Sequence, residues 1–254
     1  MTNDLSGRPK VTPSNPLVRA MGVTHYYGEL KVVDGVNLSV QPGESVGIIS
    51  PSGSGKSTLL RLLLGLERPS EGEASLLVAP SAVGVVFQED SLLPWLNVAQ
   101  NLCLLNELHK KPVDEGRRNR LLKTYGLADF TRYYPSQLSG GMKQKVALCR
   151  LLLYAPHLYA LDESMANIDD LSRFSLCDAL RSRIIQDNSS ILFVTHNLTD
   201  AVHLADRVLV GTSRPLRLTE DFVNPLPRRR DYQARFTRDF QEAVERLRIW
   251  IGQH

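Results

Sequence analysis

The stretch Ser50-Pro51-Ser52-Gly53-Ser54-Gly55-Lys56-Ser57-Thr58 decides the fold of this chain. It follows an apolar segment at residues 45–49 that predicts a buried strand, and it leads into residues 58–64, which predict a helix. A strand, a glycine-rich turn and a helix in this order are the context of a phosphate-binding loop. Gly53 and Gly55 let backbone N–H groups approach phosphate oxygens, and the helix turns its positive end toward the same anion. The stretch therefore predicts a nucleotide site.

Two side chains in this loop suit a magnesium nucleotide. Lys56 can reach the β- and γ-phosphates, and the Ser57 hydroxyl can bind Mg²⁺. The loop departs from the full pattern at Ser50, which stands where the pattern has glycine. We expect this serine to strain the backbone by about 1 kcal/mol. The alternative is a glycine-rich turn that binds no ligand, but the strand–turn–helix context favours the nucleotide site.

The composition is that of an ordinary soluble globular protein. Of the 254 residues, 43% are hydrophobic and 22% are charged, and the net charge is +3. This charge is too small to predict nucleic-acid binding, and no run approaches the roughly 18 apolar residues of a membrane-spanning helix. Residues 1–16 are polar and carry three prolines, so we expect a disordered lead-in and no secretion signal. Cys103, Cys149 and Cys177 fit neither a metal site nor a disulfide framework, which indicates packing residues in a reducing compartment.

The rest of the chain alternates strand and helix patterns around the loop. Residues 17–49 predict an antiparallel β part with a turn at residues 41–44. Residues 83–87 predict another strand, and residues 97–132 predict mostly helix with a break near Lys111-Pro112.

The second half of the chain predicts parallel strands. Short apolar runs at residues 158–161 and 191–194 are typical of buried parallel strands, and residues 171–186 predict the helix between them. This order forms a βαβ unit.

Polar side chains follow these predicted strands. Asp162 is suited to hold Mg²⁺, and Glu163, one residue on, is suited to act as general base toward water. His196 is placed to contact a terminal phosphate, and Gln88 can reach the metal or the water. Each residue alone has a simpler explanation, such as a helix N-cap or a surface position. Because ligands sit at the carboxyl ends of such strands, their combination behind a phosphate loop favours a catalytic site.

A second glycine motif, Leu138-Ser139-Gly140-Gly141-Met142, opens a helical run that continues to Tyr154. Here the chain resembles the ATP-binding subunits of ABC transporters, over roughly residues 17–215. The family's phosphate loop, Q-loop, signature, acidic strand end, D-loop and switch histidine match residues 50–58, Gln88, 138–142, Asp162-Glu163, 166–169 and His196.

The resemblance implies an α/β fold with a P-loop NTPase core. It implies a mainly parallel sheet, an N-terminal antiparallel β part and a helical insert at about residues 89–155 that carries the signature motif. Residues 216–254 would form a C-terminal tail and helix.

The resemblance also implies that the chain hydrolyses ATP, with Mg²⁺, to power an importer for a small anion or organic solute. In the family, the signature of one subunit closes over the nucleotide of another, which implies a second ATPase subunit, identical or homologous. The implied nucleotide-binding residues are Tyr27, Ser50, Pro51, Ser52, Gly53, Ser54, Gly55, Lys56, Ser57 and Thr58, with Ser139, Gly140, Gly141 and Asp169 acting in trans. The implied metal ligands are Ser57, Gln88 and Asp162, and the implied catalytic residues are Glu163, His196 and Gln88.

Tyr27 matches the family aromatic that stacks on adenine, an interaction of about 1–3 kcal/mol by analogy with base stacking. Without the resemblance, Tyr27 would be a core or edge-strand tyrosine. We expect His25 to be an exposed strand residue.

Residues 88–98 and the long tail resemble the nitrate, sulfonate, taurine and bicarbonate importers. This branch implies that Leu92, Leu93 and Trp95 line a groove for a coupling helix of a transmembrane permease subunit; the alternative for Trp95 is internal packing. Residues 228–230, three arginines, could touch anionic lipid, although a solvated charge run is the simpler expectation. The branch also implies a peripheral position on the cytoplasmic face of the inner membrane and, indirectly, a solute-binding protein.

Four features depart from the family pattern: Ser50, Ser164, Asn167-Ile168 and a short segment at residues 73–83. They leave open a weakly hydrolysing partner subunit in a heterodimeric transporter, although Glu163 and His196 favour hydrolysis. A soluble ABC ATPase of the DNA-repair or translation type usually has a long coiled-coil insert or tandem domains, and a length of 254 residues excludes both.

Overall fold

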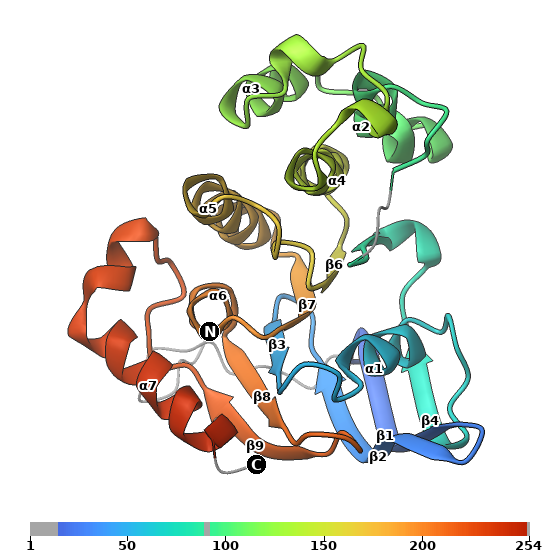
Figure 1. The fold of residues 1–254 in the computed structure, drawn as a ribbon, viewed down its shortest axis with the longest axis vertical. Coiled ribbons are helices and arrows are strands. Elements are labelled where there is room, and N and C mark those ends of the chain that lie inside the picture. The colour runs from blue at the N-terminus through green and yellow to red at the C-terminus, as the bar shows by residue number, and fades with distance from the viewer. Residues whose placement is uncertain (1–14, 89–91, 253–254) are drawn as a thin grey trace.

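Two β-sheets organise residues 15–88 and 92–252, the part of the chain that this computed structural model describes (Figure 1). The larger sheet has the strand order β5 (Val83–Val86), β6 (Leu158–Asp162), β7 (Ser190–Thr195), β3 (Ser45–Ile49), β8 (Arg207–Gly211) and β9 (Leu218–Val223), and its pairs are parallel except β8 with β9. The smaller sheet is antiparallel, in the order β2 (Leu30–Val40), β1 (Val18–Tyr27) and β4 (Glu71–Leu76). The predicted α/β class is confirmed. Residues 1–14 of the expected lead-in and residues 89–91 of the expected Q-loop lie outside the described residues.

Alternating side chains along β6 divide the hydrophobic core into two layers. Leu158 and Ala160 belong to the layer shared with the three-stranded sheet, whereas Tyr159 and Leu161 belong to the layer shared with the helices on the other side. Successive side chains of a strand point to opposite faces. A strand covered on both faces needs apolar residues throughout, which explains the continuous apolar runs in the sequence.

Helix α1 (Lys56–Leu63) lies between the two sheets and begins directly at the phosphate loop. Its four leucines, Leu59, Leu60, Leu62 and Leu63, are fully buried. Burial of a leucine side chain contributes about 1.5–3 kcal/mol. The helix therefore fixes one end of the phosphate loop in the centre of the molecule.

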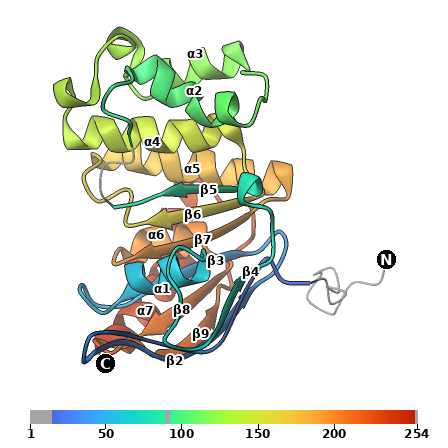
Figure 2. The same cartoon turned by 90° about the vertical axis from the view of Figure 1, so that its right-hand side faces the viewer.

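A group of helices at one end of the molecule carries the second glycine motif, while the three-stranded sheet lies at the other end (Figure 2). The group consists of α2 (Val98–Leu108), α3 (Glu115–Thr124) and α4 (Gly140–Tyr154), and the predicted helix break falls between α2 and α3. Asn97 and Gln100 exchange hydrogen bonds between each side chain and the other's backbone N–H. This reciprocal cap fixes the start of α2.

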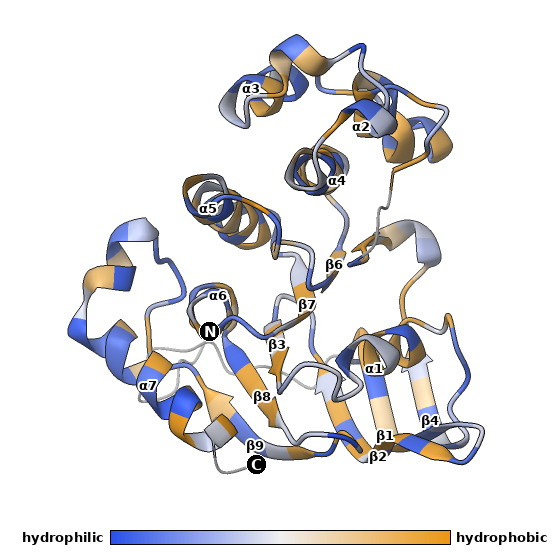
Figure 3. Ribbon diagram, viewed as in Figure 1, coloured by the Kyte–Doolittle hydropathy of each residue, from blue (hydrophilic) through white to orange (hydrophobic). Residues whose placement is uncertain are grey.

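Helices α5 (Asp170–Asp187), α6 (Leu198–Leu204) and α7 (Arg238–Gly252) cover the large sheet next to β7 and β8 (Figure 1). The expected βαβ unit is present as β6, α5 and β7. Figure 3 shows hydrophobic central strands and an α7 that mixes hydrophilic and hydrophobic residues, because α7 buries one face and exposes the other. Within the two described ranges, no helix is both long enough and apolar enough to cross a membrane.

The expectation that residues 228–230 form a solvated charge run is wrong for Arg230, whereas Arg228 is exposed although it makes polar contacts. Arg228 donates a hydrogen bond to the Gly43 carbonyl and pairs with Asp206. Arg230 is 8% exposed and donates to backbone carbonyls, and burial lowers its pKa to about 9. Arg229 is exposed. The buried guanidinium of Arg230 is thus paired with backbone carbonyls, as buried polar groups generally are.

Candidate functional site

The phosphate loop joins β3 to α1 at the carboxyl end of the parallel strands. Gly53 and Gly55 have φ values of 71° and 116°, which favour glycine. A Cβ on Gly55 would lie 2.8 Å from a carbonyl oxygen of β2, so a larger residue does not fit. Lys56 is 4% exposed and donates to the carbonyls of Ser50 and Pro51. Burial lowers the pKa of this ammonium group.

Ser50 fits the loop without the backbone strain that we expected. Among the described residues, four non-glycine residues have positive φ, and Ser50 is not one of them. Its side chain is buried, and its Oγ lies 2.5 Å from the Oγ of Ser54, so one hydroxyl donates to the other. The expected cost is therefore wrong, because serine adds a buried hydrogen bond in an ordinary backbone conformation.

Glu163 lies between the lysine of the loop and the switch histidine. Its Oε1 is 3.4 Å from Lys56 Nζ, and its Oε2 is 3.2 Å from His196 Nδ1. Glu163 has a φ of 43°, a left-handed conformation that is uncommon outside glycine. Its N–H donates to the Val194 carbonyl, which holds the turn after β6 against β7. The fold thus brings together side chains that follow three different strands.

Ser57 and Asp162 form an oxygen pair suited to a divalent cation. Ser57 Oγ donates a 2.7 Å hydrogen bond to Asp162 Oδ1. Burial raises the pKa of Asp162, so a cation at this carboxylate would compensate a charge that is costly to bury. Gln88 lines the same cavity as Ser57. Mg²⁺ takes few protein ligands and completes its shell with water and phosphate oxygens. The donor set fits it, and no cluster of three or more His, Cys, Asp or Glu forms a separate metal site among the residues described.

A cavity of about 320 Å³ connects the phosphate loop to Tyr27. The Tyr27 hydroxyl donates to Glu67 Oε2 at 2.6 Å. His25 meets the Tyr27 ring edge-on at 4.9 Å, and its Nε2 lies 3.6 Å from Glu67 Oε2. His25 is only 9% exposed, so the expectation of an exposed strand residue is wrong. The tyrosine ring is held at its hydroxyl by Glu67 and packs perpendicular to the His25 ring while it lines the cavity.

Arg214 also lines this cavity, and no sequence pattern predicts it. It belongs to the loop between β8 and β9, and its Nε and Nη2 donate to the Gly53 carbonyl at 3.1 and 2.9 Å. These two residues are 161 positions apart in the chain, and no local motif marks the arginine. Its guanidinium adds positive charge beside the phosphate loop.

The second glycine motif begins α4, away from this cavity. Ser139 accepts a hydrogen bond from the Met142 N–H and so caps the helix, whose first residues are Gly140 and Gly141. A Cβ on Gly141 would lie 2.5 Å from the Asn167 carbonyl oxygen, so the D-loop packs too closely for any larger residue. Of the described residues that line the cavity, none belongs to this motif. One chain therefore does not bring its two glycine motifs together.

Asp169 joins the D-loop to the signature helix. It accepts a hydrogen bond from the Ser172 N–H at 2.9 Å, which caps α5, and it pairs with Lys145 of α4 at 2.8 Å. The Lys145 ammonium and the Ser172 hydrogen bonds hold the pKa of Asp169 well below its usual range. Asp169 therefore stays ionised and lies beside α4, the helix that begins at the signature motif.

Trp95 is 68% exposed on the turn before α2, so the alternative of internal packing does not hold. Asn101 is fully buried and holds this turn, since its amide group donates to the carbonyls of Leu93 and Leu96. Leu92 is 6% exposed and packs in the core. The expectation that Leu92 lines an exposed groove is therefore wrong, whereas Trp95 lies at the surface and Leu93 is half-buried.

Comparison with known sequences gives consistent matches. A sequence model of the family described as "ABC transporter" matches residues 33–166. The chain is 40% identical over 229 residues to the aliphatic sulfonates import ATP-binding protein SsuB 1 of Pseudomonas aeruginosa, covering 86% of this chain and 91% of that protein. It is 37% identical over 241 residues to the aliphatic sulfonates import ATP-binding protein SsuB 2 of Rhizobium johnstonii, covering 94% of each.

Solved structures show the same fold. A dimeric post-hydrolysis state of an ATP-binding cassette bound to ADP and Pi superposes with a TM-score of 0.67 at 28% identity, covering 81% of this chain and 100% of that chain. An ATP-binding subunit of an ABC transporter superposes with a TM-score of 0.73 at 22% identity, covering 93% of this chain and 99% of that chain. The second is a likeness of fold alone.

Proposed function

Because this chain belongs to the ABC transporter family, as an ATP-binding and ATP-hydrolysing subunit of an importer, we propose that the side chains at the ends of β3, β6 and β7 carry out the hydrolysis. The observation that carries the proposal is the contact of Glu163 with both Lys56 and His196 beside the phosphate loop. The relaxed backbone of Ser50 removes the main reason to expect a weakly hydrolysing subunit.

In this proposal, Lys56 and the backbone N–H groups of residues 50–58 bind the phosphates, and Tyr27 stacks on the adenine. Water then attacks the γ-phosphate in line, and catalysis consists mainly of positioning and charge stabilisation. Glu163 accepts the proton of the attacking water as general base. Its contact with Lys56 is replaced when the lysine binds phosphate, which frees the carboxylate. His196 contacts the γ-phosphate, and Gln88 orients the water.

Ser57, Asp162 and Gln88 would hold Mg²⁺, whose charge neutralises the β- and γ-phosphate oxygens when it is bound. The support is their oxygen donors, the Ser57–Asp162 contact and the raised pKa of Asp162. The protein's own contribution is to hold the Ser57 and Gln88 oxygens in the cavity beside Lys56, with Asp162 bonded to Ser57 behind them.

Ser139, Gly140, Gly141 and Asp169 would contact the nucleotide held by a second ATPase subunit. The support is their separation from the phosphate-loop cavity of their own chain. The permease subunits would dock where Leu93 and Trp95 meet the surface, on the cytoplasmic face of the membrane. A solute-binding protein would deliver the solute to them. Since the relatives described above are sulfonate import proteins, we propose that the solute is a sulfonate.

Growth of a strain that lacks this gene, with an alkanesulfonate as sole sulfur source, tests the function and the solute together. The wild-type gene should restore growth, and the gene carrying Lys56→Ala should not, because the altered loop loses the charge that binds the phosphates. Equal growth with both genes would contradict the role in ATP-driven import. Restored uptake of another solute without growth on the sulfonate would contradict the solute class alone.

A further inference from the structure

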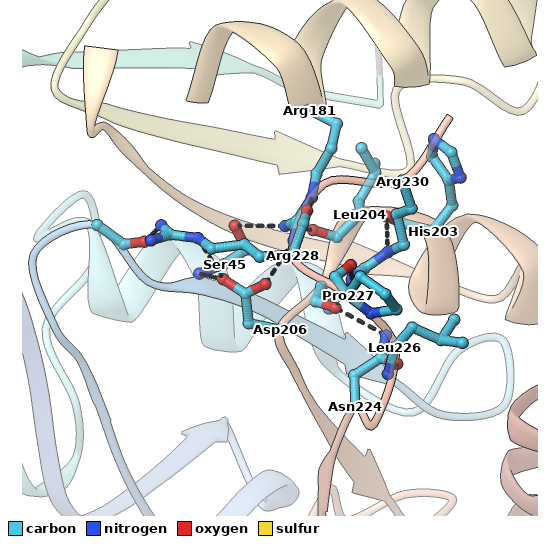
Figure 4. A network of polar contacts seen from close by, with 12 residues as sticks. Ser45, Arg181, His203, Leu204, Asp206, Asn224, Leu226, Pro227, Arg228 and Arg230 are labelled. Atoms are coloured by element: carbon cyan, nitrogen blue, oxygen red, sulfur yellow. Dashed lines mark hydrogen bonds and ion pairs between the residues drawn. The ribbon is translucent and has the colours of Figure 1, made fainter. Parts of the chain in front are cut away.

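Residues 224–236, here called the strap, connect β9 to α7 and contact both ends of α6. Figure 4 shows strap residues beside the C-terminal end of this helix, at His203 and Leu204. Helix α6 begins directly after His196 and Asn197 and is only seven residues long. Such a short helix is marginal by itself, so its position depends on what holds its ends.

The strap satisfies the carbonyls at the C-terminal end of α6. A helix leaves its last carbonyls without partners inside the helix. Asn224 donates to the carbonyls of Val202 and Ala205 at 2.8 and 2.9 Å, and Arg230 donates to the carbonyls of His203, at 2.7 Å, and Ala205. Asn224 and Arg230 are both buried. These contacts fix the end of the helix that lies away from the nucleotide site.

A third strap residue, Arg235, reaches the N-terminal end of α6. Its Nη2 lies 3.9 Å from Oδ1 of Asp200, which is in the first turn, and Arg173 of α5 lies 3.9 Å from the other carboxylate oxygen. Arg235 is 4% exposed, and among the described residues its three guanidinium nitrogens have no partner at standard hydrogen-bond geometry. Its guanidinium also stacks on Phe174 at 4.1 Å. A buried charge is costly unless it is compensated, so Asp200 accounts for the position of Arg235.

Asp200 is connected to the catalytic residues in turn. Its N–H donates to Oδ1 of Asn197 at 3.0 Å, and Asn197 directly follows His196. Asp200 also lines a cavity of about 60 Å³ together with Glu163 and His196. A shift of Asp200 would therefore move the start of α6 and the histidine next to it.

The strap is attached at particular points and does not pack along its whole length. Arg181 of α5 donates to the Arg228 carbonyl at 2.9 and 2.6 Å and pairs with Asp206 at 2.5 Å, as Figure 4 shows. A cavity of about 660 Å³ lies between another part of the strap and α5, lined by residues that include Ile185, Gln186 and Pro227. Tyr232 of the strap packs on Phe174 of α5, and its N–H donates to Asp178 at 3.2 Å. The strap therefore contacts both ends of α6 and packs on α5 over part of its own length, which is the arrangement of a positioning element.

We propose that the strap positions His196 for hydrolysis, with Arg235 acting through Asp200 at one end of α6 and Asn224 and Arg230 acting at the other. Arg235 is thus a positioning residue and touches no substrate. The proposal rests on the role proposed above for His196.

The test compares steady-state ATP hydrolysis by the full-length chain and its variants. Arg235→Met keeps the aliphatic stem over Phe174 and removes the charge, so kcat should fall by about tenfold while KM for ATP stays unchanged, because a residue acting only at the chemical step alters kcat alone. Arg235→Lys should restore most of kcat. The matched control is Arg238→Met, whose side chain is 89% exposed and pairs with Glu242 of its own helix, and it should behave as wild type. Asn224→Ala tests the other end of α6 without altering a buried charge, and it should also lower kcat alone.

The double variant His196→Ala/Arg235→Met separates positioning from a general loss of stability. If the strap acts through His196, Arg235→Met should cause no further loss in the His196→Ala background, since residues that act as a unit are not additive. Losses that multiply, or a kcat that Arg235→Met and Asn224→Ala leave unchanged, would overturn the strap's role. A normal kcat for His196→Ala alone would instead overturn the function proposed for the histidine.

Discussion

Ser50 and Ser54 share a buried hydrogen bond at the base of the phosphate loop, and this contact decides what Ser50 contributes. Ser50 departs from the glycine of the phosphate-loop pattern, but its side chain adds a hydrogen bond that glycine could not make. The loop therefore keeps the N–H groups that face the phosphates in place.

Replacing Ser50 tests this contact directly. Both Ser50→Gly and Ser50→Ala should lower the free energy of unfolding by about 1 kcal/mol, the typical net contribution of a hydrogen bond, with a further loss for glycine from backbone entropy. Neither should raise ATP affinity or turnover. Urea unfolding and ATP titration measure both quantities. A Ser50→Gly variant that binds ATP more tightly would show that the serine does strain the loop.

Tyr27 offers a second prediction at this scale. Tyr27→Phe removes the hydroxyl that donates to Glu67 but keeps the ring, so ATP affinity should remain close to that of wild type. Tyr27→Ala removes the stacking face and should cost about 1–3 kcal/mol of ATP binding. Equal affinities for the phenylalanine and alanine variants would contradict the stacking role.

At the scale of the elements, the turn before α2 is the surface that best suits the docking of another protein. Asn101 holds its backbone from inside, and Trp95 is exposed on it without a packing role in the core. An exposed aromatic on a firmly held turn suits docking of another protein.

Trp95→Ala should leave the melting temperature of the isolated chain nearly unchanged and weaken co-purification with the permease subunits. A tryptophan packed in the core would instead cost about 3–5 kcal/mol of stability. Leu108→Ala is the matched control, because Leu108 is an exposed apolar side chain at the other end of α2. It should affect neither measurement. A large fall in melting temperature with normal permease binding would contradict the docking assignment.

The sequence predicts the elements whose patterns are long or whose ends carry polar residues. The glycine loop, β6 with Asp162 and Glu163, and β7 with His196 could be predicted, because parallel strands end at the same edge of a sheet. The elements β4, β8, β9 and α6 could not, since they are about as short as β6 and β7 but do not end in residues of the predicted site. The roles of Arg214 beside the phosphate loop and of Arg235 beside α6 depend on contacts between segments far apart in the chain. No local sequence pattern encodes such contacts.

At the scale of the whole molecule, the cavity at Tyr27 and the signature motif lie apart in one chain. In the proposed function, a nucleotide held in the cavity would be completed by the signature of another chain, and hydrolysis would belong to a pair of chains. Closure on ATP and opening after hydrolysis would then move the attached permease subunits.

The central claim is that Glu163 is the general base of this paired ATPase, and hydrolysis by Glu163→Gln tests it most directly. The variant keeps the size of the side chain but cannot accept a proton. We expect turnover to fall by at least about 10²-fold, the typical contribution of a general base, with ATP affinity retained and an ATP-bound dimer visible by light scattering. Undiminished turnover in Glu163→Gln would contradict the account.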